Sequence, residues 1–565
     1  MSRVEARARL AVASACVLSF GNSLFSRGWP RDDRWLILEH PLLRAGLPGA
    51  RELLTSGYVQ PLLGAQTPIH EWRPVLSLTF LLQRLTTGFA PFPFHAVNLT
   101  LHVLSALLVH EALRRRLGGR AATAGALLFA VLPVHAETVA YLTSRSELLG
   151  LLCVLGAWLL LGAPERPRAR RLAAGAGAYL AGCLSKEHVL LFPLFLLMSD
   201  WTFCAVMPWH ARRRAIYLSL LAATALVLLG RGLVLPSLAC GGVPYFGGVP
   251  LLPRLLTLAK FWSWHYVRPA VTGVGLCSDY ARPFFPDSTL YDLPAWAGLL
   301  GLIALVSFSV RSFLKREPWG FWLLGPCLFL LPTSHLLMPL DTLGAQRFLY
   351  LPSLALAAGA GALFLRAETR APRAARAALG AVLVWLGARA ALRAADWQDD
   401  VSYYRAAAAC NPVSAKARSG LGAALLREGR NDEGEREILA ASDLDPGLYD
   451  AAFNLARLSW GRGDRAQASK NLARARALRP DEPDALVLQA LLDESEGRPA
   501  AAAAALARAL RVRPHDAVAR YNHARMLALL GQKRQAAVEL KEFLRLAPDD
   551  ADAPVARRWL AELER

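Results

Sequence analysis

Long apolar runs alternate with short charged loops over the first 395 residues of the chain. The first run, from Leu10 to Ser26, carries no charge, follows three arginines and is long enough to cross a bilayer. The run from Leu172 is short for a span, and Asp200 falls inside the next run. The pattern predicts an all-α membrane region of about eleven spans, at residues 10–26, 94–113, 121–142, 147–163, 172–186, 188–207, 215–235, 294–310, 319–340, 348–365 and 377–394.

Lysine and arginine crowd into every second loop, where acidic residues are sparse. Short loops with this composition stay in the cytosol. The arginine-rich loops lie on the same side as the N-terminus, so we expect a cytosolic N-terminus and a first extracytosolic loop at about residues 27–93. Residues 255–267 then lie in the interface or re-enter from outside, because a full span would break the alternation. The basic loops contain Arg114–Arg116, Arg120, Arg166, Arg168, Arg170, Arg171, Arg212–Arg214, Arg311, Lys315, Arg316, Arg366, Arg370, Arg373 and Arg376.

The opposite loops collect acids, imidazoles and guanidiniums. Each has an ordinary structural interpretation: Asp32 and Asp33 are loop charges balanced by neighbouring arginines, and Arg145 with Glu147 is a local ion pair. Together they favour a polar site at the outer membrane interface, since charges beside a bilayer are costly and tend to be kept for function. The group comprises Asp32, Asp33, His70, Glu71, Arg73, His135, Glu137, Arg145, Glu147, Lys186, Glu187, His188, Asp279, Arg282, Asp341 and Arg347.

A strict period of 34 residues follows the last span. Prolines recur at 412, 446, 480, 514 and 548, and glycines at 429, 463, 497 and 531. Glycine permits a tight turn between two helices, and proline marks the start of the next unit. The period predicts an α-solenoid of four helix-turn-helix repeats at about 412–547, with a leading helix at 397–410 and a capping helix at 551–565. The chain thus divides into residues 1–395 and 396–565, and the parity of the spans places the array outside the cytosol.

The composition agrees with a membrane protein, because 54% of the residues are hydrophobic and the mean hydropathy is +0.29. The net charge of +20 comes from arginine clusters between apolar runs, so binding of nucleic acid is not expected. Eight cysteines lie apart, without the spacing of zinc ligands, and are expected to be small core residues that say nothing about redox compartment. Abundant alanine and arginine with little lysine favour a bacterial inner membrane over an endoplasmic reticulum.

Several short motifs follow one another in a fixed order along nearly the whole chain. They are Asp32-Asp33, Trp72-Arg73-Pro74-Val75, Phe94-His95-Ala96-Val97-Asn98-Leu99 with His102, Pro133-Val134-His135-Ala136-Glu137-Thr138-Val139, Ser144-Arg145-Ser146-Glu147, Ser185-Lys186-Glu187, Arg347-Phe348-Leu349-Tyr350-Leu351-Pro352-Ser353 and Trp397. In these motifs and their order the chain resembles the transmembrane and tetratricopeptide-repeat O-mannosyltransferase family. One departure is Arg31, which stands where an aromatic residue usually precedes the acidic pair; Trp29 lies two positions earlier.

The resemblance implies a membrane glycosyltransferase of the GT-C type that takes a sugar, mannose by the family name, from a polyprenyl-phosphate carrier. Either Asp32 or Asp33 would be the base that deprotonates a Ser or Thr hydroxyl of a polypeptide docked on the repeats. The other would orient the acceptor or help hold a divalent metal; no metal or other cofactor is required. Candidates for binding the donor phosphate are Arg73, Arg145, Lys186 and Arg347. Candidates for a sugar or acceptor pocket are His135, Glu137 and Tyr350, the first two having a structural hydrogen-bond network as the alternative.

Two other functions compete with the enzyme. A membrane-anchored repeat scaffold would use the outer charges for helix packing alone and would bind no lipid-linked sugar. A transporter would carry paired charges at the bilayer midplane together with inverted repeats, and no such repeat is present in the membrane region.

Overall fold

The computed structural model describes residues 3–64, 69–163, 168–204, 210–235, 245–280, 285–337, 340 and 342–565. Arg282, Asp341 and Cys240 lie outside these ranges. Every regular element in the described residues is helical, which confirms the predicted all-α class. The chain forms two compact units, each built from separate segments: Met1–Gly28, Ala90–Leu233 and Gly242–Asp399 make up the first, and Trp29–Phe89, Val234–Gly241 and Asp400–Arg565 the second.

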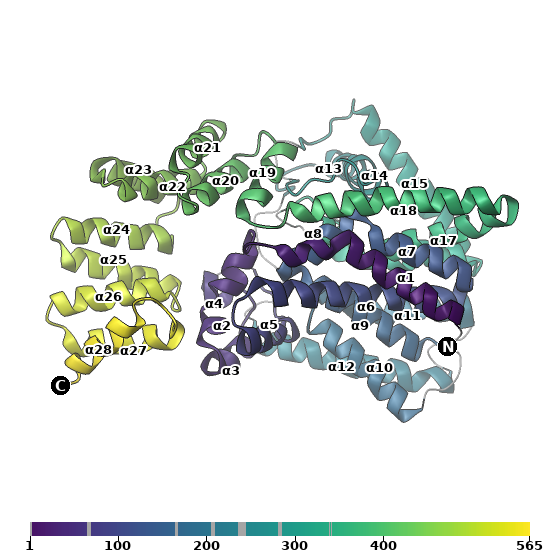
Figure 1. Ribbon diagram of the computed structural model, residues 1–565, viewed down its shortest axis with the longest axis horizontal. Coiled ribbons are helices and arrows are strands. Elements are labelled where there is room, and N and C mark those ends of the chain that lie inside the picture. Colours follow the sequence, from purple (N-terminus) through teal and green to yellow (C-terminus); the bar gives the residue numbers. More distant parts are fainter. Residues whose placement is uncertain are drawn as a thin grey trace. The chain divides into compact units, whose positions relative to one another are not determined.

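Long helices dominate the first unit, and most of them are labelled in Figure 1. Short 3-10 or π-helical turns join many of them. The α-helices are α1 (Arg3–Phe20), α6 (Pro91–Leu117), α7 (Gly119–Val131), α8 (Ala136–Ala140), α9 (Arg145–Leu161), α10 (Ala169–Cys183), α11 (Phe192–Ser199), α12 (Ala211–Val234), α13 (Leu251–Lys260), α14 (Arg268–Thr272), α15 (Leu293–Leu314), α16 (Pro318–Cys327), α17 (Ser353–Arg370) and α18 (Pro372–Ala395). The turns are η1 (Gly21–Phe25), η4 (Pro133–His135), η5 (Leu142–Ser144), η6 (Glu187–Leu191), η7 (Asp200–Cys204), η8 (Phe261–Val267), η9 (Leu328–Thr333) and η10 (Gln346–Leu349).

Seven helical segments among the described residues are long and apolar enough to span a bilayer. They are Arg3–Phe25, Pro91–Leu117, Leu142–Leu161, Glu187–Cys204, Arg213–Val234, Leu293–Leu314 and Pro372–Ala395. The pair Gly119–Val131 and Pro133–Ala140, bent by 50°, would make an eighth. The predicted membrane character is confirmed, but the count of eleven is not. The predicted spans at 172–186, 319–340 and 348–365 fall instead on α10, which has 15 residues, on α16, which holds Pro326, and on α17, whose last turn is charged.

Small residues bring α7 and α17 into close contact. A Cβ atom added at Gly125 would overlap the carbonyl oxygen of Ala357, and one added at Gly361 would overlap that of Ala121. Helices in membranes commonly pack through such small residues, because lipid offers no hydrophobic driving force for their association. The turn η10, which contains Arg347, shortly precedes α17 in the chain. The contact between α7 and α17 therefore places η10 beside η4.

The second unit joins the first extramembrane loop to the repeat array. The loop contains η2 (Arg34–Leu38), α2 (Pro41–Ala45), η3 (Leu47–Gly49), α3 (Ala50–Thr55), α4 (Gln60–Leu63) and α5 (Pro74–Thr87). The array contains α19 (Asp400–Cys410), α20 (Ala415–Arg427), α21 (Asn431–Leu444), α22 (Tyr449–Gly461), α23 (Arg465–Leu478), α24 (Pro483–Ser495), α25 (Pro499–Val512), α26 (Ala517–Leu529), α27 (Lys533–Leu546) and α28 (Ala553–Leu563).

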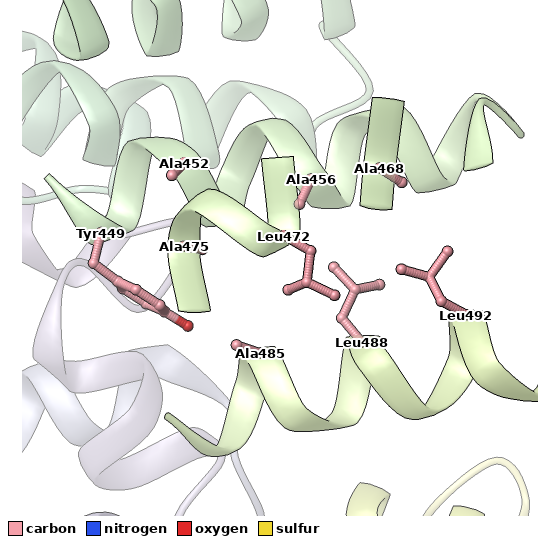
Figure 2. Packing of buried hydrophobic residues seen from close by; sticks show 9 residues of the cluster. All are labelled: Tyr449, Ala452, Ala456, Ala468, Leu472, Ala475, Ala485, Leu488 and Leu492. Atoms are coloured by element: carbon pink, nitrogen blue, oxygen red, sulfur yellow. The ribbon is translucent and has the colours of Figure 1, made fainter. Parts of the chain in front are cut away.

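The helices of the array pack in pairs, as the 34-residue period predicts (Figure 1). The four periodic glycines adopt φ values of 73° to 78°, a left-handed conformation that ends the first helix of each pair at low cost. Alanine and leucine fill the seam between neighbouring helices. Figure 2 shows one seam, in which Ala456 of α22 lies near Leu472 of α23, with Leu488 of α24 beside them. The predicted solenoid is confirmed by these pairs.

Candidate functional site

The acidic doublet lies on a strained turn at the start of the first loop. Arg31 has a φ of 54°, which is uncommon for a residue with a side chain. Asp33 precedes the π-helical turn η2 and is completely buried, whereas the side chain of Asp32 is 33% exposed. The indole Nε1 of Trp35 donates a hydrogen bond of 3.2 Å to Asp32 Oδ1, and Arg31 Nε lies 3.6 Å from Asp32 Oδ2. One carboxylate therefore meets solvent while its neighbour is enclosed.

The arginines beside the doublet are tied to the first helix of the array. The backbone N–H of Arg31 donates to Asp400 Oδ1 at 2.7 Å, and Arg34 Nε donates to Asp400 Oδ2 at 3.2 Å. Arg34 also pairs with Glu39 at 3.4 Å. Burial raises the pKa of Tyr404 in α19, and the negative charge of Asp32 raises it further. The doublet is thus electrostatically linked to α19.

A second set of contacts joins the same loop to the other end of the array. Arg84 pairs with Asp549 at 2.5 Å, Arg44 with Asp550 at 3.5 Å, and Glu52 with His515 at 2.7 Å. His40, which caps α2, is buried in the same region, and burial lowers its pKa to about 3. The loop therefore contacts both the leading helix α19 and the C-terminal end of the array.

Arg73 of the second unit is largely buried at the start of α5. It donates to Glu71 Oε1 at 2.8 Å, and its guanidinium lies 5.8 Å from the ring centre of Tyr58. The backbone carbonyl of Arg73 accepts a hydrogen bond from the backbone N–H of Ser77, in the first turn of α5, which begins at Pro74. These contacts fix the turn of the Trp72-Arg73-Pro74 motif.

Two ion pairs form a charged cluster in the first unit. Arg347 Nη1 lies 2.5 Å from Glu137 Oε1, and Lys186 Nζ lies 2.9 Å from Glu147 Oε1. The charge of Arg347 also acts on Glu147, so the pairs are neighbours. Both carboxylates are buried, whereas the side chains of Lys186 and Arg347 remain 12% and 24% exposed. Buried acids thus hold two cations toward the surface of the unit. His188 joins the cluster at 3.7 Å from Glu147.

Arg145 is completely buried and joins two helices. Its guanidinium donates to Asn98 Oδ1 at 2.7 Å and to the carbonyl oxygen of Phe94 at 3.1 Å. Asn98 also donates to the carbonyl of Val139 at 3.3 Å. These bonds satisfy polar groups inside the unit and hold α9 against α6.

Two predicted site residues, His135 and Tyr350, form a buried polar and aromatic cluster with His102 and Ser353. His135 Nε2 lies 2.9 Å from Ser353 Oγ, and His102 Nδ1 lies 2.9 Å from the hydroxyl of Tyr350. The rings of His135 and Tyr350 are 4.7 Å apart, and neither side chain is exposed. The arrangement matches a structural hydrogen-bond network, which was the alternative expected for His135.

The nine predicted site residues fall on both units. Asp32, Asp33 and Arg73 belong to the second unit, and the other six belong to the first. Among the latter, Glu137 binds Arg347 and His135 contacts Tyr350. No group of three or more metal-binding side chains is found in the described residues, so the expectation of a divalent metal stays a prediction. Asp400 was missed, because an aspartate at a helix start looks like an ordinary cap in sequence.

Cys277 and Cys410 are both disulfide-bonded. Cys277 follows α14, and Cys410 ends α19. The expectation that all cysteines are core thiols is therefore wrong for these two, since their spacing in sequence gave no indication of a bond. Cys16, Cys153, Cys183, Cys204 and Cys327 are free.

No family model matches this chain, but comparison with known proteins identifies relatives. The protein O-mannosyl-transferase Tmtc1 of Drosophila melanogaster is 28% identical over 545 residues, covering 79% of this chain and 63% of that protein. This chain is related to proteins named O-mannosyl-transferases. The protein O-mannosyl-transferase Tmtc3 of Drosophila melanogaster is 26% identical, and the match covers 75% of this chain and 54% of that protein. Human TMTC1 is 35% identical over 150 residues, or 26% of this chain and 17% of its own.

The predicted family resemblance is thereby confirmed. This chain spans at most 63% of the length of those three relatives. Among solved structures, a tetratricopeptide-repeat protein of Thermus thermophilus has a TM-score of 0.26 and 20% identity, covering 31% of this chain and 93% of that protein. The solenoid is assigned from the helix pairs of this chain itself.

Proposed function

We propose that the protein transfers a sugar, mannose by analogy with its relatives, from a polyprenyl-phosphate carrier to Ser or Thr hydroxyls of proteins on the extracytosolic side of a membrane. The observation that carries this proposal is similarity over 79% of the chain to a protein named O-mannosyl-transferase. The apolar helices supply a membrane location for a lipid-linked donor.

Asp32 is our candidate for the base. An acceptor hydroxyl must reach the base within hydrogen-bond distance, and Asp32 is the more exposed acid of the doublet. The hydroxyl oxygen would form a bond to the anomeric carbon as its proton passes to the carboxylate. The bond between that carbon and the phosphate oxygen would break, and the lipid phosphate would leave with the electron pair. Asp33 would orient Asp32 or the acceptor.

Lys186 and Arg347 are our candidates for the donor phosphate. Both side chains are partly exposed, and both are oriented by buried carboxylates. Arg73 is a further candidate. We assign Arg145 to joining α6 and α9 and assign His135 and Tyr350 to packing, since all three side chains are enclosed. Glu137 would act through Arg347.

Two observations support an extracytosolic location for the doublet and the array. The loop that carries the doublet and the array belong to one compact unit, so they share one compartment. Disulfides persist in oxidising compartments, and both disulfide-bonded cysteines lie outside the candidate spans. In this arrangement the repeats would dock the acceptor polypeptide and raise its effective concentration near Asp32. A bacterial inner membrane and an endoplasmic reticulum membrane would each place the doublet and the array outside the cytosol. The amino-acid composition favours the bacterial inner membrane.

A transfer assay tests the proposal. The purified full chain, in lipid nanodiscs, would receive polyprenyl-phosphate mannose carrying a radiolabel and a panel of Ser/Thr peptides. We expect label in the peptide with the unchanged protein, and at least a 100-fold lower rate with Asp32→Asn and with Asp33→Asn. Asp432→Asn is the matched control, because Asp432 is 90% exposed on the array. Transfer at the normal rate by both doublet variants would refute the proposed roles, and inactivity of the unchanged protein would favour a scaffold.

A further inference from the structure

Asp400 is the shared partner of the segments on either side of the doublet. It is the first residue of α19 and is largely buried. One carboxylate oxygen accepts from the backbone of Arg31 at 2.7 Å. The other accepts from Arg34 Nε at 3.2 Å and from Arg427 Nη2 at 2.6 Å. A single side chain thus contacts the residue before the doublet, the residue after it and the end of α20.

The bond to Arg31 stabilises a backbone conformation that is otherwise unfavourable. A non-glycine residue at a φ of 54° persists only where its surroundings hold it, and Asp400 accepts from the N–H of this residue. The guanidinium of Arg31 lies 5.7 Å from the ring centre of Tyr403 in α19 and 3.6 Å from Asp32. The direction of Asp32 therefore depends on a turn that α19 holds in place.

The negative charge of Asp400 also balances two arginines. Arg34 and Arg427 approach the same carboxylate oxygen and would repel each other without it. Arg34 would then be drawn toward other nearby acids, of which Glu39 is one and the doublet another. Arg427 ends the first helix of the first repeat, so a shift of that repeat reaches Arg34 through Asp400.

We infer that Asp400 is a positioning residue that couples the repeat array to the acidic doublet. Its carboxylate sets the turn that aims Asp32, and movement of the first repeat on binding an acceptor polypeptide changes that turn. The inference rests on the proposed function for its catalytic consequence, whereas its structural part stands on the contacts alone.

Two measurements on the full chain in nanodiscs test the inference. Asp400→Asn keeps an acceptor of similar shape but removes the charge, and Asp432→Asn is again the control. Hydrogen exchange followed by mass spectrometry should show at least tenfold faster exchange at residues 31–38 in Asp400→Asn, with α24 to α27 unchanged. The transfer assay should show kcat lowered at least tenfold with KM for the lipid donor within twofold. Asp400→Glu should recover part of kcat.

The outcomes separate this inference from the proposed function. Unchanged exchange at residues 31–38 would overturn the positioning role, whatever the activity. Faster exchange with normal kcat would overturn the coupling to catalysis. An unchanged protein without transfer activity would count against the proposed function, and the exchange result would still decide whether Asp400 holds the turn.

Discussion

Buried charges in this protein are matched by partners from neighbouring elements. One almost fully enclosed pair joins Asp200 of η7 to Arg213 of α12, whose side chains are 0% and 1% exposed. Their atoms are 2.6 Å apart, and the hydroxyl of Tyr217 donates to the second oxygen of Asp200 at 2.9 Å. An acid inside an apolar run, which fits a span poorly by sequence alone, is thus explained by its partners.

Removal of Asp200 should destabilise the first unit strongly. A buried charge that loses its partner costs about 3–5 kcal/mol, whereas an exposed ion pair contributes about 1 kcal/mol or less. We therefore expect Asp200→Ala to lower the free energy of unfolding by about 3–5 kcal/mol, measured by denaturant titration in mild detergent. Lys541→Ala, which breaks the exposed pair with Glu564, is the control. Equal losses of unfolding free energy in the two variants would show that the buried pair contributes no more to stability than the exposed pair.

His40 should make the second unit sensitive to acid. Burial lowers the pKa of His40 from 6.5 to about 3 in the folded chain. Between pH 6.5 and pH 3, His40 is therefore protonated in the unfolded chain but neutral in the folded chain. Stability therefore falls as the pH drops below 6.5, by about 2 kcal/mol at pH 5. His40→Asn keeps a cap for α2 without a titrating group. Denaturant titrations at pH 7 and pH 5 should show this extra loss in the unchanged protein alone, and the same loss in both proteins would exclude His40 as its source.

At the scale of elements, the contact between α7 and α17 depends on glycine at particular positions. Gly361 faces the carbonyl of Ala121, whereas a Cβ atom added at Gly359 of the same helix would meet no atom within 4 Å. Gly361→Ala should destabilise the protein by about 1–3 kcal/mol, because the helices must separate. Gly359→Ala should be neutral or stabilising by up to about 1 kcal/mol, since alanine favours a helix.

Thermal unfolding in detergent would compare the two alanine variants. A lower melting temperature for Gly361→Ala alone supports the close packing of α7 on α17. Matching melting temperatures would mean that the helices are further apart than the structure places them.

The two parts of the chain differ in how far sequence predicted their elements. The repeating helix pairs of the array were predicted from the sequence, because each repeat contacts mainly its neighbours and so leaves a local period. The membrane helices were predicted less well. Hydropathy does not register the proline in α16, and the run from Leu172, already short for a span in the sequence, forms a helix of 15 residues. Eight of the eleven expected spans match candidates in the structure when the bent pair at α7 and α8 is included.

At the scale of the whole molecule, the candidate site was predicted as a set of residues but not as a set of contacts. The motifs containing Glu137, Lys186 and Arg347 were singled out, yet their ion pairs join residues up to 210 positions apart and leave no local pattern. Asp400 was not singled out either, because its partners Arg31 and Arg34 lie 369 and 366 positions away in the sequence. The burial of His135, Arg145 and Tyr350 depends on packing that periodicity cannot reveal.

The account depends on sidedness: the loop with the acidic doublet and the repeat array must face the same extracytosolic compartment. Labelling of introduced cysteines with a membrane-impermeant maleimide in intact cells measures this directly. Leu47→Cys in the loop, Asp432→Cys in the array and Arg120→Cys at the start of α7 are all at exposed positions. We predict labelling above that of the unchanged chain for Leu47→Cys and Asp432→Cys, and for Arg120→Cys only after permeabilisation. Labelling of the loop and the array from opposite sides, or of both from the cytosol alone, would contradict the account.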